Sequence, residues 1–190
     1  MIAKLVEVKE IKGKGKGLFA KEFIPKGTII CFECIKCRTL SGIEPDKMSI
    51  KEKENLFNYA YRKKDGSFIA PCDETRYLNH SCNANVLGTE LGFDIVVRDI
   101  KNGEEATYDY RCFYEDIKMP CCCGEKNCCK VVTFEHPVPA ELARYWKKEV
   151  DAALQMVNKV KQPLKEELKQ KSIFLPLHEK PMPKMKTGNM

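Results

Sequence analysis

Five of the eleven cysteines in this chain lie within residues 121–129, which read CCCGEKNCC. In a reducing compartment, such cysteines bind metal or pack in a core more often than they form disulfides. A structural zinc ion needs four thiolate or imidazole ligands in a tetrahedron. Three candidates fit a C-x-C-x4-C pattern: Cys121, Cys123 and Cys128. The fourth ligand comes from elsewhere in the chain or from the adjacent Cys122 or Cys129, and disulfides are the alternative to a metal.

The compartment is indicated by features that the sequence lacks. It contains no apolar run long enough to cross a membrane, and its N-terminus has no apolar core of the kind found in secretory signals. We therefore expect an intracellular protein, which is nuclear or chromatin-associated in a eukaryote and otherwise cytoplasmic. The formal charge of +6 is concentrated in residues 137–190, which hold 11 Lys or Arg and 6 Asp or Glu. This segment allows weak association with nucleic acid or chromatin, although an ordinary solvated lysine-rich face explains it as well.

The first 136 residues predict a mainly β domain, because short β-rich runs alternate with glycine turns and helical periodicity is scarce. We expect strands over five segments: residues 1–11, 28–35, 68–72, 92–98 and 106–110. The glycine-rich run at residues 12–17 is expected to form a loop. Residues 41–56 are polar and are the candidate for a helix in this part of the chain.

The pattern changes from Pro139 onward. Apolar residues recur every three or four positions to about residue 161, which predicts a C-terminal amphipathic helix that ends before Pro163. A second short helix is expected over residues 164–171, and the Pro- and Lys-rich end of the chain predicts disorder. The Trp146 face of the long helix most simply packs on the domain. A dimer through this helix is the alternative, and the sequence leaves the oligomeric state open.

Three further motifs contain residues suited to a binding or catalytic site. Residues 13–17, GKGKG, let a backbone approach a ligand closely, although an ordinary glycine hairpin has the same composition. Residues 76–85, RYLNHSCNAN, offer amide, imidazole and backbone groups to a polar ligand. Residues 103–110, GEEATYDY, place Tyr108 and Tyr110 on one face of an expected strand, where they either serve a site or are half-buried structural residues.

Taken in order, the four motifs resemble those of the SET-domain protein lysine methyltransferases that have a post-SET zinc-binding segment. The resemblance covers about residues 1–130. It implies a SET fold, made of small curved sheets with a pseudoknot that joins the two middle motifs. The implied division gives residues 1–118 to the SET domain, 119–136 to the post-SET cysteine segment, 137–172 to the amphipathic helical extension and 173–190 to a disordered tail.

The resemblance also assigns roles to individual residues. The residues implied for S-adenosylmethionine binding are Lys14, Gly15, Lys16, Gly17, Asn79 and His80. The ligands implied for structural Zn²⁺ are Cys82, Cys121, Cys123 and Cys128, so that Cys82 supplies the missing fourth thiolate. Tyr110 matches the family's catalytic tyrosine, and Tyr108 matches the position that influences how many methyl groups are added. Because tyrosine leaves less room there than phenylalanine, we expect mainly monomethylation.

The implied activity is transfer of methyl groups from S-adenosylmethionine to lysine side chains of a protein substrate, possible substrates being a histone or another chromatin-associated protein. Tyr110 is expected to orient the amine, with positioning rather than a strong base supplying most of the acceleration. Ala84 and Ala106 stand where the family has proline and leucine, and neither change removes a chemical group. The alternative is an inactive zinc-containing SET-fold binding module. Retention of Asn79, His80 and Tyr110 favours the enzyme.

Three other cysteines, Cys31, Cys34 and Cys37, have a C-x2-C-x2-C spacing. On a regular strand Cys34 would face away from the other two, so we expect core cysteines and no three-ligand site. A thiol redox or metal-storage protein would also be rich in cysteine, but it leaves the two middle motifs unexplained. A DNA methyltransferase is disfavoured because no Rossmann-type cofactor loop is present.

Overall fold

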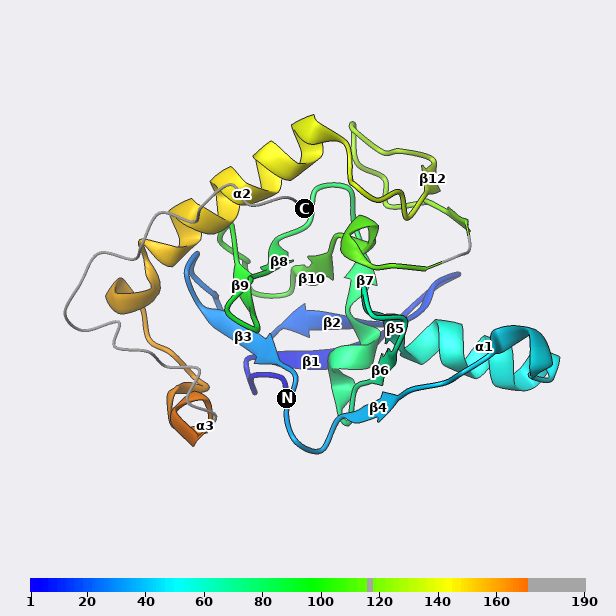
Figure 1. Cartoon of the computed structure of the whole chain (residues 1–190). Helices are drawn as coiled ribbons and strands as arrows, with labels where there is room; N and C mark the ends of the chain where they lie inside the picture. The colour runs from blue at the N-terminus through cyan, green and yellow to red at the C-terminus, as the bar shows by residue number, and fades with distance from the viewer. Residues whose placement is uncertain (116–117, 171–190) are drawn as a thin grey trace.

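The computed structural model describes residues 1–115 and 118–170, and their arrangement is mainly β with helices at the C-terminal side (Figure 1). The expected fold class is therefore confirmed. The main sheet has seven strands in the order β1-β2-β10-β8-β9-β3, and β7 pairs with β10 outside this path. The strands are β1 (Val6–Ile11), β2 (Gly15–Ala20), β3 (Ile29–Phe32), β7 (Asn79–His80), β8 (Val86–Gly88), β9 (Phe93–Val96) and β10 (Glu105–Tyr108).

Strand β10 brings the two middle motifs side by side. It runs parallel to β7, with Tyr108 opposite His80, and parallel to β8, with Tyr108 opposite Val86. Asn85 is fully buried between these segments, and its side chain accepts from Thr107 N and donates to Glu105 O, each at 2.8 Å. Asn85 therefore satisfies two backbone groups of β10 with its side chain, beside the point where β7 and β8 pair with that strand.

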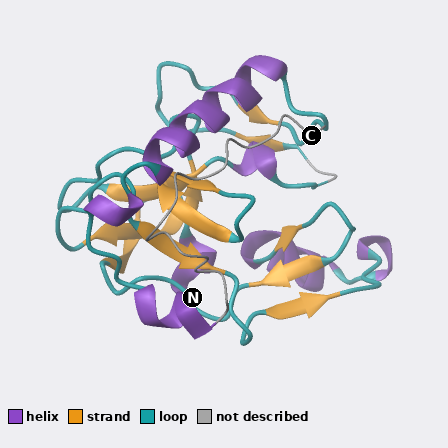
Figure 2. Cartoon of the chain, turned by 60° about the vertical axis from the view of Figure 1, so that its left-hand side comes forward, coloured by secondary structure: helices purple, strands orange, loops and turns teal. Residues whose placement is uncertain are grey.

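A separate three-stranded sheet lies apart from the main one (Figure 2). It has the order β4-β6-β5 and consists of β4 (Arg38–Leu40), β5 (Tyr61–Arg62) and β6 (Phe68–Ala70), with α1 (Ile50–Tyr59) between β4 and β5 in the chain. We call residues 38–70 the insert. The helix expected within residues 41–56 begins late because Ser49 and Glu52 form a reciprocal capping box at its N-terminus.

Strand β3 is shorter than expected, and this corrects the prediction for the nearby cysteines. The strand ends at Phe32, and a turn follows in which Cys37 N donates to Cys34 O at 2.9 Å. Cys31 is a fully buried core residue, as expected. Cys34 is buried in the same core and Cys37 is partly buried against it, as expected of core cysteines. The strand geometry expected for them was wrong, because a turn, unlike a strand, brings positions three apart together. Their sulfurs lie 3.9 Å apart.

The long C-terminal helix packs on the main sheet. Helix α2 (Ala140–Leu154) lies along the top of the domain beside β8 and β9 (Figure 1). Its residues Val150, Ala153 and Leu154 belong to the main hydrophobic core of the domain. Its apolar face is therefore covered by its own chain. No helix among the described residues is long and apolar enough to span a membrane.

Helix α2 ends earlier than the position of Pro163 predicts. The chain after it turns closely past Gly27, where a Cβ would lie 2.5 Å from Met156 Cβ. Gln162 then anchors the following segment by donating to Gly27 O and accepting from Ile29 N, both at 2.9 Å. Tertiary contacts thus end α2 before the proline. Helix α3 (Lys165–Gln170) follows, and the expected tail, residues 173–190, lies outside the described residues.

Candidate active site

The glycine motif meets the second motif at Gly17. Asn79 Nδ2 donates to Lys16 O at 2.9 Å and to Glu105 Oε1 at 2.8 Å. A Cβ at Gly17 would lie 2.6 Å from Glu105 Oε1 and 3.0 Å from Asn79 Nδ2, so glycine permits this close approach. Lys16, Gly17 and Asn79 are therefore brought together. Lys14 and Gly15 lie further along the hairpin, at its exposed end.

Replacing Gly17 with alanine is expected to destabilise the fold by about 1–3 kcal/mol, because the new methyl group must displace Asn79 and Glu105. Urea denaturation measures this loss. The matched control is Glu10→Ala, an exposed position on the paired strand, for which a change within about 0.5 kcal/mol is expected. Equal stability of Gly17→Ala and the control would show that the Gly17 contact is not restrictive.

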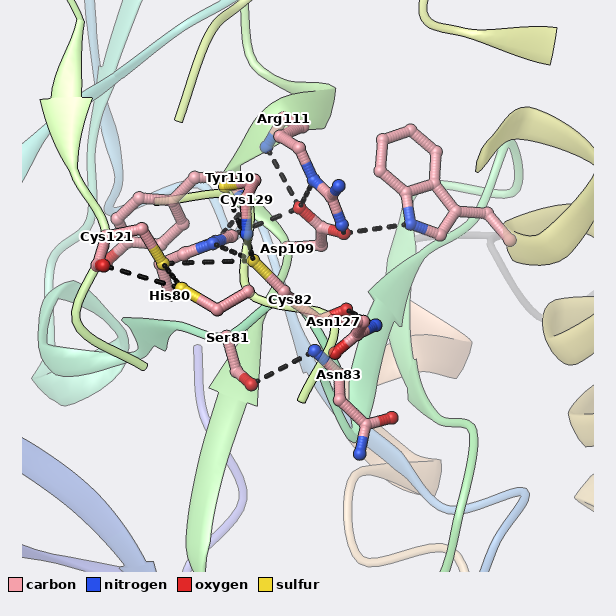
Figure 3. A network of polar contacts seen from close by, with 12 residues as sticks. His80, Ser81, Cys82, Asn83, Asp109, Tyr110, Arg111, Cys121, Asn127 and Cys129 are labelled. Carbon is pink, nitrogen blue, oxygen red and sulfur yellow. Dashed lines mark hydrogen bonds and ion pairs between the residues drawn. The ribbon is translucent and has the colours of Figure 1, made fainter. Parts of the chain in front are cut away.

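The buried His80 side chain links Tyr110 to the cysteine cluster (Figure 3). Its Nδ1 accepts from Tyr110 N at 3.1 Å, so in the neutral ring Nε2 carries the proton. Nε2 lies 3.4 Å from Cys82 Sγ and donates to it. Burial lowers the pKa of His80, although the Asp109 carboxylate opposes this shift. The imidazole is therefore neutral at physiological pH and orients its neighbours.

Tyr110 opens a 3-10 turn, Tyr110–Cys112, and does not continue strand β10. The expectation that Tyr108 and Tyr110 share one face of a strand was therefore wrong. The two rings still converge, because each packs against Phe113 with centroids 5.5 Å apart. The Tyr110 hydroxyl donates to Leu78 O at 2.7 Å. Burial, with a smaller effect of Glu105, raises the pKa of Tyr110, so its phenol stays protonated.

Both tyrosines line a cavity of about 190 Å³, whose walls come from the main sheet and the insert. Its walls are rich in aromatic rings: Phe32, Phe57, Tyr59, Tyr61, Tyr108, Tyr110, Phe113 and Phe134. Asp94 is among the few acidic residues of the lining. An aromatic cavity with a carboxylate has the chemistry to hold a cation with an apolar stem.

Asp94, on β9, is a site residue that the sequence analysis missed. Its Oδ1 accepts from the Tyr108 hydroxyl at 3.2 Å, and its Oδ2 accepts from the Cys31 thiol at 2.9 Å. Burial raises the pKa of Asp94, and within the two described ranges no ion pair is recorded for it. The signal that could have identified it is an acidic residue inside an otherwise apolar strand, GFDIVVR.

The four predicted zinc ligands lie together. Sγ atoms of Cys82, Cys121, Cys123 and Cys128 are all within 4.8 Å of one another. Those of Cys82 and Cys121 are 3.8 Å apart, and those of Cys121 and Cys128 are 3.6 Å apart. Tetrahedral zinc with Zn–S bonds of about 2.3 Å holds its sulfurs about 3.8 Å apart. The donor set and its spacing therefore fit Zn²⁺.

A second grouping shares two of these cysteines and contains His80, Cys82, Cys121 and Cys129. Cys129 Sγ lies 3.4 Å from Cys82 Sγ, whereas Cys122 is exposed (Figure 3). His80 is the weaker candidate for a ligand, because its Nε2 carries the proton when Nδ1 accepts from Tyr110 N. The four-cysteine set is therefore favoured, with the His80 N–H donating to the sulfur of a ligand.

Asp109 connects the helical extension to this site, a role that the sequence did not predict. Its carboxylate forms two hydrogen bonds with the Arg111 guanidinium, at 2.8 and 2.6 Å. It also accepts from Trp146 Nε1 on α2 at 3.1 Å. Because Asp109 is only 2% exposed, these partners balance a charge that would otherwise be costly to bury. Helix α2 thus supports the turn that holds Tyr110.

The chain is similar in sequence to a known protein family. Residues 15–111, just over half of the chain, match the family model of the SET domain. Human "Histone-lysine N-methyltransferase 2D" is 33% identical over 129 residues, covering 62% of this chain and 2% of that protein. "Histone-lysine N-methyltransferase trithorax" of Drosophila virilis is 44% identical over 126 residues, covering 61% of this chain and 3% of that protein. The chain therefore spans only a few per cent of the length of these relatives.

Two solved structures align over about two thirds of the chain. The methyltransferase domain of human Histone-lysine N-methyltransferase SETMAR has a TM-score of 0.48 and 24% identity, over 68% of this chain and 58% of that one. KRYPTONITE in complex with mCHG DNA and SAH has a TM-score of 0.49 and 21% identity, over 67% of this chain and 29% of that one. The family model includes three of the four motifs either in part or whole. The chain belongs to the SET-domain family.

Proposed function

We propose that this protein transfers methyl groups from S-adenosylmethionine to lysine side chains of a protein substrate. The observation that carries the proposal is the aromatic cavity lined by Tyr108, Tyr110 and Asp94. Its rings suit the four-carbon stem of lysine, and its carboxylate suits the ammonium group. The naming of relatives as histone-lysine N-methyltransferases supports the same reaction class, and a histone or another chromatin-associated protein is the proposed substrate.

The chemistry requires a neutral amine. A free lysine has a pKa of about 10.4, and desolvation in a cavity lined by aromatic rings favours loss of its proton. When bound, S-adenosylmethionine would supply the methyl group of its sulfonium to the amine nitrogen and leave as a neutral thioether, the positive charge passing to the methylated amine. Tyr110 holds its phenol in place through Leu78 O and orients the amine for in-line attack. Because that proton is donated to Leu78 O, the hydroxyl offers its oxygen as an acceptor to an amine N–H, and the protonated phenol is unsuited to act as a general base.

The cofactor is proposed to bind where the glycine motif meets the second motif. Lys16, Gly17 and Asn79 already share hydrogen bonds and close contacts there, and His80 follows Asn79 on β7. Lys14 and Gly15 extend the same hairpin. Residues 13–16 of this segment are exposed, and their glycines add no side chain that would keep a ligand from the backbone. These six residues are proposed together as the S-adenosylmethionine site.

The degree of methylation is proposed to depend on Tyr108. Its hydroxyl binds Asp94 and packs so closely on Gly88 that a Cβ there would overlap it. The hydroxyl thus occupies space beside the amine, which favours mainly monomethylation.

For Tyr108→Phe we expect dimethyl- and trimethyl-lysine to accumulate, because loss of the hydroxyl opens room for added methyl groups. Intact-mass analysis of the methylated peptide over time measures this distribution. Tyr59→Phe, a cavity tyrosine that is 42% exposed, is the matched comparison. Abundant trimethyl product from the unmodified protein would contradict the proposal.

The function is tested by incubating the protein with S-adenosylmethionine and a mixture of basic proteins, followed by residue-level mass spectrometry. New methyl-lysine that is absent with Tyr110→Phe supports the enzyme. No methylation of any protein, including itself, together with retained zinc, supports the inactive binding module instead.

Partners and place in the cell complete the proposal. The basic residues 137–190 are proposed to give weak association with nucleic acid or chromatin, and a nuclear or chromatin location follows if the source is eukaryotic. The division at residues 118, 136 and 172 is kept as the proposed domain organisation. A dimer through α2 must use its exposed side, because the apolar face is buried in the same chain.

A further inference from the structure

Three cysteines outside the cluster of residues 82 and 121–129 form a second thiol group. Cys34 and Cys37 come from the turn after β3, and Cys72 follows β6 on the other side of the insert. Cys34 Sγ lies 3.9 Å from Cys37 Sγ and 3.4 Å from Cys72 Sγ, and the third distance, Cys37 to Cys72, is 3.9 Å. Three thiols from two distant segments thus meet at one point.

We propose that Cys34, Cys37 and Cys72 bind a second zinc ion as thiolates. The three sulfur separations bracket the roughly 3.8 Å expected between ligands of tetrahedral zinc with Zn–S bonds of about 2.3 Å. Cys34 and Cys37 also have the C-x2-C spacing that is common among zinc ligands, with the two intervening residues in a turn. Soft thiolate donors select zinc over hard cations such as magnesium.

The coordination has three protein ligands and one open position. Cys34 is buried, Cys37 is intermediate and Cys72 is exposed, so the triad opens to solvent on the Cys72 side. A water molecule completes the tetrahedron there. This arrangement differs from the four-cysteine set at Cys82, which closes its own coordination sphere.

The place of the triad in the fold gives the metal a structural effect. Cys34 and Cys37 precede β4 and Cys72 follows β6, so one ion joins the points where the chain enters and leaves the insert. Cross-links that close long loops restrict the unfolded chain and oppose local opening. The insert supplies Phe57, Tyr59 and Tyr61 to the cavity, so the ion fixes the base of one cavity wall.

Zinc content of the purified full-length protein tests the proposal independently of any methyltransferase activity. After gel filtration, the unmodified protein is expected to carry two zinc equivalents per chain. The double variant Cys34→Ser/Cys72→Ser is expected to keep one, and Cys82→Ser/Cys121→Ser is expected to keep the other. Cys122→Ser, an exposed cysteine outside both groups, is the control and should keep two.

A second readout uses the unmodified protein and does not depend on a variant that folds. Exposed Cys72 should resist alkylation in the zinc-loaded protein and react once a chelator has removed the metal. Hydrogen exchange over residues 38–70 should become faster on the same treatment. The proposal is overturned if the protein carries one zinc per chain and Cys72 is alkylated equally with and without chelator. A mass lower by two hydrogens, mapped to a Cys34–Cys72 disulfide, also overturns it.

Discussion

Tyr110→Phe is expected to lower kcat for lysine methylation about 10²–10³-fold, the scale seen when one preorganised hydrogen-bonding group is removed from an active site. The ring is buried beside His80 and Phe113, and its hydroxyl is fixed by Leu78 O at 2.7 Å. Phenylalanine keeps these ring contacts and removes only the hydroxyl, whose oxygen can accept from the amine. The substrate amine then loses the group that aligns it with the transferring methyl.

The stability of Tyr110→Phe should change much less than its activity. Loss of one hydrogen bond to Leu78 O costs about 1 kcal/mol, which denaturant unfolding can measure. Single-turnover methylation followed by mass spectrometry gives the rate. Tyr145→Phe, the same deletion on the 41% exposed Tyr145 of α2, should leave the rate unchanged. Full activity of Tyr110→Phe would remove Tyr110 from the reaction.

The predictions from sequence were strongest where a motif contains several site residues in a row. Asn79 and His80 pair with β10 next to Tyr108. The pairing of β7 with β10 therefore brings the residues of two sequence motifs to one place. The position of Cys82 beside Cys121 agrees with the family pattern of zinc ligands. The spacing of the cysteines alone did not decide whether the fourth ligand is a distant residue, Cys122 or Cys129. The family resemblance therefore predicted which residues approach one another, whereas motif chemistry alone had left the fourth ligand open.

Features made by tertiary contacts were not predictable in this way. Asp94 meets Cys31 across the paired strands β3 and β9 and meets Tyr108 at the end of β10, and one acidic residue in a strand does not indicate its partners. The Cys34–Cys72 contact depends on a turn immediately after Phe32, where the apolar pattern predicted more strand. In both cases the contact depends on residues that are distant in sequence, and a local hydrophobic periodicity does not indicate such contacts.

Loss of the metal expected at Cys82, Cys121, Cys123 and Cys128 is the second large predicted effect. The expected post-SET segment, residues 119–136, contains a small sheet, β11 (Met119–Pro120) with β12 (Val131–Val132). Among the described residues, its core cluster has only Cys82, Cys121 and Val132 as buried members. So small a core cannot offset the entropy of ordering the segment. Metal binding by small zinc domains supplies about 10–16 kcal/mol at neutral pH, which is enough to decide whether they fold.

Cys121→Ser is therefore expected to release one zinc equivalent and to speed hydrogen exchange over residues 118–136, while the main core stays folded. Its kcat/KM for methylation should fall at least about 100-fold, because Tyr110 packs against this cluster and His80 Nε2 faces Cys82. Cys122→Ser is the matched control and should keep both zinc and rate, since Cys122 is exposed and outside the grouping.

Cys121, like Cys82, belongs to both possible ligand sets, whereas Cys123 and Cys129 each belong to one. If four cysteines hold the ion, Cys123→Ser should lose zinc as Cys121→Ser does, and Cys129→Ser should retain it. The opposite order would assign the site to the set that contains His80. Retention of the zinc and the full rate by Cys121→Ser would exclude both sets, and the order of the post-SET segment would then need a source other than metal.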